Sequence, residues 1–177
     1  MKNYKKNLEL LEKNHVYSKE MEHDACGVGV IVSTEGKKSR EIVQHGIEAL
    51  KAVWHRGAVD ADGKTGDGAG IHVEIPKDFF IEKIEVTGHD YDNAEICVGM
   101  IFLPRNDYSA QESCKTIVES ELTKNNFSIY GWRQVPVNPK ILGQKALQTM
   151  PEIIQVLFKS NDNNLLEKNL ERKIYET

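Results

Sequence analysis

The sequence contains 177 residues, of which 40% are hydrophobic and 28% charged, and its 23 basic and 27 acidic side chains leave a formal net charge of −4. These values are typical of one globular domain and argue against a surface that neutralises the phosphates of nucleic acids or anionic membranes. The longest apolar runs, residues 28–32 and 96–103, are far shorter than the ~20 residues that span a bilayer. We therefore expect a soluble protein that binds neither nucleic acid nor a membrane.

The amino-terminal segment, residues 1–24, is charged and rich in asparagine. It lacks the apolar stretch of a secretory signal and is too acidic for an organelle transit peptide. The cysteines, Cys26, Cys97 and Cys114, are odd in number and include no Cys-x-x-Cys pair, and no two histidines have the spacing of a helical metal site. We therefore expect a cytoplasmic protein with neither a disulfide framework nor a bound metal.

The composition changes abruptly at residue 25, where small and β-branched residues replace the charged ones. Residues 25–32 predict a buried strand. Ser39 is a suitable cap for a helix whose apolar stripe runs from Ile42 to Trp54. Gly57 follows the last turn as a C-cap would, so the helix is expected to end before it.

A loop at 60–68 contains three glycines and precedes residues 69–75, whose alternation predicts a strand. The triplet Gly63-Lys64-Thr65 is not a phosphate-binding loop, because the glycine required five positions earlier is absent and the residues that follow break a helix. The start of the loop also fails as a calcium site, since later ligand positions hold lysine and isoleucine. Dinucleotide-binding fingerprints near Cys26 and Gly66 lack their third glycine.

The second half of the chain also alternates between strand and helix patterns. We predict strands at 96–103, 127–137 and 153–158, a helix that Ser109 opens and residues 124–126 end, and a helix at 165–174. The chain ends inside this last pattern without a cap, which we interpret as the end of a partial chain. The alternation alone favours a doubly wound parallel sheet.

Cys26 lies at the junction between the polar segment and the apolar run. If cleavage after Ala25 made Cys26 the first residue, its free α-amine, with a pKa of ~7.7–8.0, could take the thiol proton and later return it to a leaving group. The alternative is that Cys26 is a small core residue like Cys97 and Cys114, which we predict to be structural.

Arg56 and the turn Gly66-Asp67-Gly68 form a second candidate site. The guanidinium can hold a carboxylate through paired hydrogen bonds, and glycines let backbone amides approach a ligand. The alternative is a cation that is favourable near a helix C-terminus, followed by a flexible turn.

Five separated blocks in this sequence resemble, in order and spacing, the start of the large subunit of glutamate synthase. They are residues 21–29, 55–58, 65–71, 75–80 and 131–137. The amino-terminal domain of that family is a class II glutamine amidotransferase of the N-terminal-nucleophile hydrolase type. The resemblance covers the chain from about residue 20 onward and favours the functional alternative at both candidate sites.

The resemblance implies a leader at 1–25 and the leading portion of an amidotransferase domain at 26–177. It implies an α+β fold, a four-layer αββα sandwich of which the C-terminal part is missing here. Cys26 is then the nucleophile that releases ammonia from L-glutamine through a thioester, and Arg56, Gly66, Asp67 and Gly68 are candidates for substrate binding. In the family the ammonia and 2-oxoglutarate yield glutamate in a synthase domain.

The resemblance places no cofactor in this chain, and it implies FMN and an iron–sulfur cluster for the full-length enzyme. Its further partners are the remaining domains and, as electron donor, a small subunit or ferredoxin. The family's oxyanion-hole Asn-Gly pair and its carboxylate for the substrate amine lie beyond residue 177. The alternative function is therefore a catalytically inactive fragment that serves as a binding or interaction module.

Overall fold

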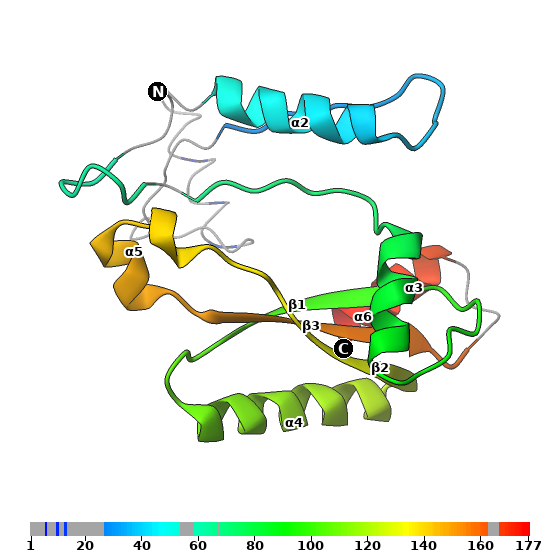
Figure 1. The fold of residues 1–177 in the computed structure, drawn as a ribbon. Coiled ribbons are helices and arrows are strands. Elements are labelled where there is room, and N and C mark those ends of the chain that lie inside the picture. The colour runs from blue at the N-terminus through cyan, green and yellow to red at the C-terminus, as the bar shows by residue number, and fades with distance from the viewer. Residues whose placement is uncertain are drawn as a thin grey trace. The chain divides into compact units, whose positions relative to one another are not determined.

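A computed structural model describes residues 27–53, 59–66, 68–162 and 167–177, together with three isolated positions, Lys6, Leu10 and Lys13. The chain divides into two compact units, residues 1–57 and 58–177, which are described separately below. Figure 1 shows the elements of each unit in chain order.

The first unit contains α2, which spans Arg40–Ala52. The predicted cap is confirmed, because the Ser39 hydroxyl accepts a hydrogen bond from the Ile42 amide at 3.4 Å. The helix ends before Val53, and the predicted end residues Trp54 and Gly57 lie outside the described part of the chain. No residue of α2 is buried within the described structure.

The predicted buried strand at 25–32 is wrong over its described residues, because residues 27–33 form no strand. Val28 and Val30 are 89% and 79% exposed. A β-branched run has the local preference for extended backbone, but a strand also requires a partner for its amide and carbonyl groups. Among the described residues, no strand pairing involves this segment.

The second unit is built on a three-stranded antiparallel sheet with the order β1-β3-β2. Its strands are β1 (Cys97–Leu103), β2 (Phe127–Gln134) and β3 (Glu152–Ser160). The parallel sheet favoured by the strand–helix alternation is wrong, since the central strand β3 runs antiparallel to both neighbours. The mixed helix-and-sheet class implied by the family resemblance is confirmed, with one sheet among the described residues.

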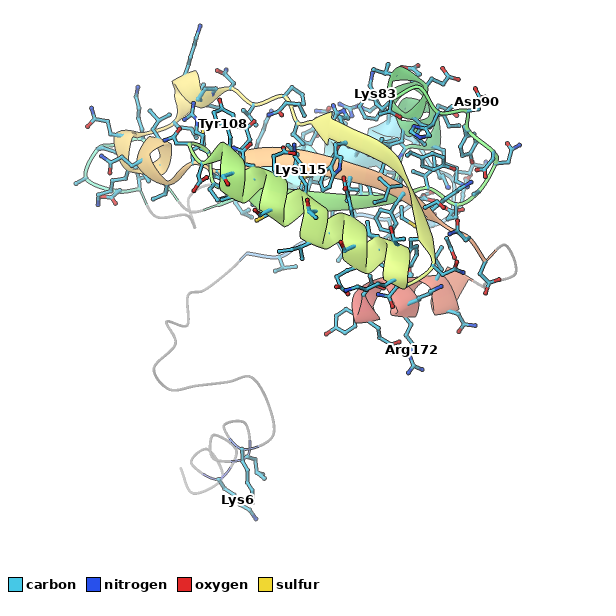
Figure 2. All side chains as sticks on the ribbon, turned by 90° about the horizontal axis from the view of Figure 1, so that it is seen from below. Lys6, Lys83, Asp90, Tyr108, Lys115 and Arg172 are labelled. Atoms are coloured by element: carbon cyan, nitrogen blue, oxygen red, sulfur yellow. The ribbon has the colours of Figure 1, made fainter. Side chains whose placement is uncertain are left out.

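Helices cover the two faces of the sheet unequally (Figure 1). On one face, α4 (Tyr108–Lys124) and α6 (Glu167–Glu176) contribute Leu122 and Leu170 to a core with Val156 and Phe158 of β3. On the other face, α3 (Lys77–Val86) packs through a smaller cluster, whose buried members are Phe80, Ile84, Ile96, Tyr130 and Leu157. Figure 2 shows α6 lying near the carboxyl end of α4, opposite to the end that carries Tyr108.

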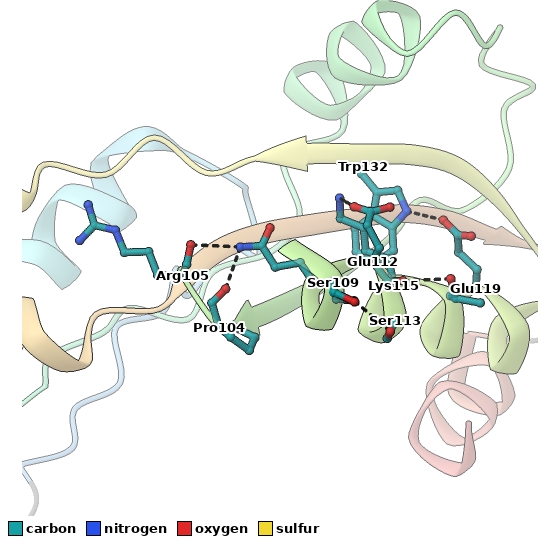
Figure 3. Close-up of polar contacts among 10 residues, drawn as sticks. Pro104, Arg105, Ser109, Glu112, Ser113, Lys115, Glu119 and Trp132 are labelled. Atoms are coloured by element: carbon teal, nitrogen blue, oxygen red, sulfur yellow. Dashed lines mark hydrogen bonds and ion pairs between the residues drawn. The ribbon is translucent and has the colours of Figure 1, made fainter. Parts of the chain in front are cut away.

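Polar contacts fix α4 against the sheet (Figure 3). Asp107, rather than the predicted Ser109, caps the helix by accepting from the Ala110 amide at 2.9 Å. The buried Gln111 side chain donates to the Pro104 carbonyl at 2.7 Å, which satisfies the turn from β1 into the helix. Farther along α4, Glu119 accepts from the Trp132 indole of β2 at 2.7 Å.

The predicted strand at 69–75 is also wrong, because these residues form no strand and all are exposed. The predicted strand at 127–137 is shorter than expected and ends at Gln134, with a register shift at Gly131. Three elements had no sequence-based prediction: α3, the 3-10 helix Pro139–Ile141 and α5 (Gln144–Thr149). In the part of the chain that the structure describes, no helix is long and apolar enough to cross a membrane.

Candidate functional site

Of the five predicted site residues, Gly66 and Gly68 belong to the described structure. Cys26, Arg56 and Asp67 lie outside it, so their predicted roles stay predictions. A side chain placed on Gly68 would meet nothing within 4 Å, and residues 68–76 are all exposed. The described part of the turn is therefore accessible to a ligand.

Gly66 closes a small hairpin, residues 59–66, by forming an isolated antiparallel bridge with Val59. Inside the hairpin the Asp60 amide donates to the Thr65 carbonyl at 2.7 Å, and the Gly63 amide donates to the Asp60 carbonyl at 2.9 Å. Gly63 has a φ of 68°, a left-handed conformation that glycine adopts without steric cost. These bonds define the backbone that leads into the predicted turn.

The carboxylate of Asp62 organises the inside of the hairpin. Its Oδ1 atom accepts from the backbone amides of Lys64 at 2.9 Å and Thr65 at 2.7 Å, and its Oδ2 atom accepts from the Thr65 hydroxyl at 2.6 Å. The Thr65 hydroxyl is the largest cause, followed by the two amides, of a pKa for Asp62 well below its usual value. The side chain therefore stays ionised, and stays an acceptor, at any pH near neutrality.

The hairpin rests on the amino end of α5. Gly143, the cap residue of α5, is buried, and a Cβ atom placed there would lie 2.5 Å from the Thr65 backbone nitrogen. It would lie even closer to the side-chain oxygens of Thr65 and Asp62. A second connection is the ion pair between Lys145 of α5 and Asp60, at 2.6 Å.

Sequence reasoning missed this contact. The sequence around Asp60 and Asp62 does not fit a calcium site, and no local pattern connects these two residues with positions about 80 residues later. Within the described residues, no group of three or more His, Cys, Asp or Glu side chains is placed to hold a metal ion.

The two described cysteines differ in burial. Cys97 of β1 is 4% exposed, and burial raises the pKa of its thiol to about 11. Cys114 is half-buried on α4, and both thiols are free. A buried, protonated thiol is a poor nucleophile, which agrees with the structural role predicted for Cys97.

Comparison with known proteins identifies the family. The sequence model described as "Glutamine amidotransferases class-II" matches residues 26–177. This chain belongs to the class II glutamine amidotransferases. The match begins at Cys26 and includes the hairpin, the sheet and all the helices of the second unit.

The relatives confirm the predicted resemblance to glutamate synthase. The chain is 50% identical over 172 residues to the "Glutamate synthase [NADPH] large chain" of Azospirillum brasilense, covering 97% of this chain and 11% of that protein. It is 39% identical over 155 residues to "Ferredoxin-dependent glutamate synthase 1, chloroplastic/mitochondrial" of Arabidopsis thaliana, covering 87% and 9%. For "Glutamate synthase [NADH]" of Saccharomyces cerevisiae the values are 38% over 153 residues, 83% and 7%. The chain thus spans about a tenth of the length of these relatives.

Proposed function

We propose that this chain is the glutamine-hydrolysing part of a glutamate synthase, with Cys26 as its nucleophile after removal of residues 1–25. The observation that carries the proposal is the family match, which begins at Cys26 and continues to residue 177. The names of the relatives support it, since they are enzymes that make glutamate. No comparison supports the alternative of a non-catalytic module.

The proposed reaction needs one residue to act as nucleophile and base. The α-amine of Cys26 takes the thiol proton, the sulfur attacks the side-chain amide carbon of glutamine, and the amine returns the proton to the departing ammonia. Water then adds to the thioester, and cleavage of the C–S bond releases glutamate and restores the thiol. A peptide bond to Ala25 would remove the base, so the mechanism requires the leader to be cleaved.

For substrate binding we propose Arg56 together with Gly66, Asp67 and Gly68. Arginine presents a planar pair of donors that matches the α-carboxylate of glutamine, which the point charge of lysine does not reproduce. The accessible backbone beside Gly68 supports a role for the turn in contacting the substrate. Of these residues, Gly66 and Gly68 lie between regular elements of the second unit, and binding residues are commonly found in such connecting segments.

The remaining parts of the proposed enzyme lie outside these residues. Cys97 and Cys114 belong to different elements, and no described group of side chains suits an iron–sulfur cluster. Because the family resemblance implies FMN, an iron–sulfur cluster and a 2-oxoglutarate site for the full-length enzyme, we propose that these lie in other domains of a cytoplasmic enzyme. The relative with 50% identity is named for NADPH and the ferredoxin and NADH relatives have 38–39%, which favours NADPH and a small subunit over ferredoxin as the electron source.

We also propose that the full protein has the four-layer αββα sandwich of N-terminal-nucleophile hydrolases. The helices α4 and α6 supply an outer layer on one sheet face. On β1, Met100 and Phe102 are 49% and 63% exposed, which supports a second layer over the opposite face. The segment 69–75 is exposed and its apolar residues alternate along the sequence, so it is suited to a strand that finds its partner in that second sheet.

The test of the nucleophile uses a chloroketone analogue of glutamine on a glutamate synthase large chain that carries this sequence, hereafter the full-length enzyme. We expect one equivalent of label on Cys26 of a chain whose mass shows cleavage after Ala25, with Cys97 and Cys114 unlabelled. Cys26→Ala should abolish labelling and glutamine-dependent synthesis while leaving ammonia-dependent synthesis intact. Full activity of a chain that retains residues 1–25 would exclude the mechanism.

The test of the binding residue is Arg56→Lys in the same enzyme. We expect KM for glutamine to rise by about 10-fold or more, since a charge-assisted bidentate pair is lost. Ammonia-dependent synthesis serves as the control and should not change. Equal losses of both activities would assign Arg56 to folding instead.

A further inference from the structure

The close contact between Gly143 and the 59–66 hairpin joins two parts of the second unit that are distant in sequence. Gly143 is buried, and even a methyl group there would overlap Thr65 and Asp62. Because the atoms it would meet include the Thr65 backbone nitrogen, a rotamer change cannot relieve the overlap. A side chain at position 143 therefore displaces the hairpin or the start of α5.

Polar contacts across the same junction hold the hairpin in one position. Asp60 pairs with Lys145, and the backbone amide of Lys145 also contributes to the low pKa of Asp62. Asp62 in turn binds the amides of Lys64 and Thr65 and the Thr65 hydroxyl. The acceptor groups of the hairpin thus face the donors at the start of α5.

The position of the hairpin determines the position of the predicted substrate turn. Thr65 immediately precedes Gly66, and Gly66 is paired to Val59 on the other side of the hairpin. Arg56 lies three residues before Val59 in the sequence. Residues 68–76, in contrast, are exposed, so burial does not hold the turn on its other side. A shift at Thr65 is therefore passed on to Gly66 and the turn.

We propose that the amino end of α5 is the docking site of the 59–66 hairpin. Asp62, Gly143 and Lys145 are then positioning residues for glutamine binding. The inference rests on the proposed function, because it requires that Gly66 and Gly68 belong to the glutamine site. The three residues touch no substrate in this proposal. They set where the substrate turn lies, and a misplacement of about 1 Å can cost 10²-fold in a catalytic site.

The first test is Gly143→Ala in the full-length enzyme. We expect KM for glutamine to rise by about 10–100-fold while ammonia-dependent synthesis stays unchanged. The matched control is Gly99→Ala in β1, where an added Cβ would lie 2.7 Å from Val156 Cγ1 in the sheet. This control creates an overlap with a side chain away from the hairpin, so we expect it to lower thermal stability without a change in KM for glutamine.

Variants of polar side chains test this docking site without adding a larger side chain. Asp62 is exposed, so Asp62→Ala should leave the fold intact and raise KM for glutamine, whereas Asp62→Asn keeps an oxygen for the two backbone amides and should restore most of the affinity. Lys145→Met should raise KM by about two- to fivefold, as expected of a partly exposed ion pair. Its control is Lys77→Met, which removes the Lys77–Glu95 pair of α3 and should leave KM unchanged.

Two results would overturn the inference. One is a KM for glutamine within twofold of the wild-type value in both Gly143→Ala and Asp62→Ala. The other is a parallel loss of glutamine-dependent and ammonia-dependent activity in these variants, which would show a general folding defect.

A wild-type enzyme that releases no ammonia from glutamine would instead refute the proposed function. The docking of the hairpin on α5 remains testable in that case by amide hydrogen exchange, because the Asp60 and Gly63 amides donate hydrogen bonds within the hairpin. These amides should exchange faster in Gly143→Ala than in Gly99→Ala. Equal exchange rates would refute the docking of the hairpin on the amino end of α5.

Discussion

Val156 and Leu157 in the central strand are 2% and 0% exposed, whereas no residue from 68 to 76 is buried. The hairpin before that exposed segment is held by hydrogen bonds, one ion pair and one glycine contact. The sheet thus takes its position from the burial of apolar area, which is shared among many side chains. The hairpin takes its position from a few polar contacts, so we expect single substitutions to shift it while the scaffold stays folded.

The largest effect expected from this comparison is that of Leu157→Ala. Leu157 is fully buried in the cluster beneath α3, so the substitution removes transfer free energy and leaves a cavity. We expect the free energy of unfolding to fall by about 2–5 kcal/mol. Urea unfolding of the 177-residue chain measures it, with Val86→Ala at an 82% exposed position as the control. Equal losses in the two variants would show that the sheet does not depend on burial.

A glycine pair sharpens the comparison. Gly131 in β2 has a φ of 147°, and an added Cβ would lie 2.8 Å from Thr87 Cγ2. Gly70, in the exposed segment, has nothing within 4 Å of such an atom. We expect Gly131→Ala to cost about 1–3 kcal/mol because the backbone and the contact are both strained.

For Gly70→Ala we expect a change of less than about 0.5 kcal/mol, as for other open surface positions. The same urea experiment on the 177-residue chain measures both variants. If Gly70→Ala were as destabilising as Gly131→Ala, the segment at 69–75 would have to be packed.

The sequence correctly predicts an element where an apolar run or stripe coincides with a residue that marks the start or the end of the element. The runs that become β1 and β3 are continuous, and Pro104 marks the end of the first. The capped helix α2 was predicted by Ser39 and its apolar stripe. Two other apolar runs, 28–32 and 69–75, have the same local character but no partner among the described residues, and pairing is a property that a single segment does not encode.

The elements without a sequence-based prediction, and the contact between the hairpin and α5, show a second limit of prediction from sequence. α3 begins at a cap without a side-chain hydrogen bond, and α5 is six residues long with a glycine cap, so neither carries a start signal. The candidate residues Cys26 and Arg56 could be proposed because motifs surround them. The contact of Thr65 with Gly143 depends on tertiary packing between distant residues, which local patterns do not contain.

The smallest expected effect concerns a polar cluster on the scaffold itself. Asp92 accepts from the buried Tyr130 hydroxyl at 2.6 Å and from Lys159. The Lys159 bond, followed by the Tyr130 bond, lowers the pKa of Asp92 to about 2 from the ordinary value of 3.8. Because the carboxyl is more acidic in the folded state, ionised Asp92 favours folding above pH 4, and this contribution disappears as the pH falls toward 2.

Asp92→Asn should therefore lower stability by no more than about 1 kcal/mol at neutral pH, since water screens this exposed group. The difference from wild type should shrink below pH 4 and vanish near pH 2. Urea titrations at a series of pH values measure this, with Asp90→Asn in the same loop as the control (Figure 2). A stability difference that does not change with pH would mean that the amide disturbs packing, because only the loss of a titrating carboxylate produces the predicted slope. In that case the scaffold, like the hairpin, would owe part of its geometry to one polar side chain, and the contrast between the two regions would be one of degree.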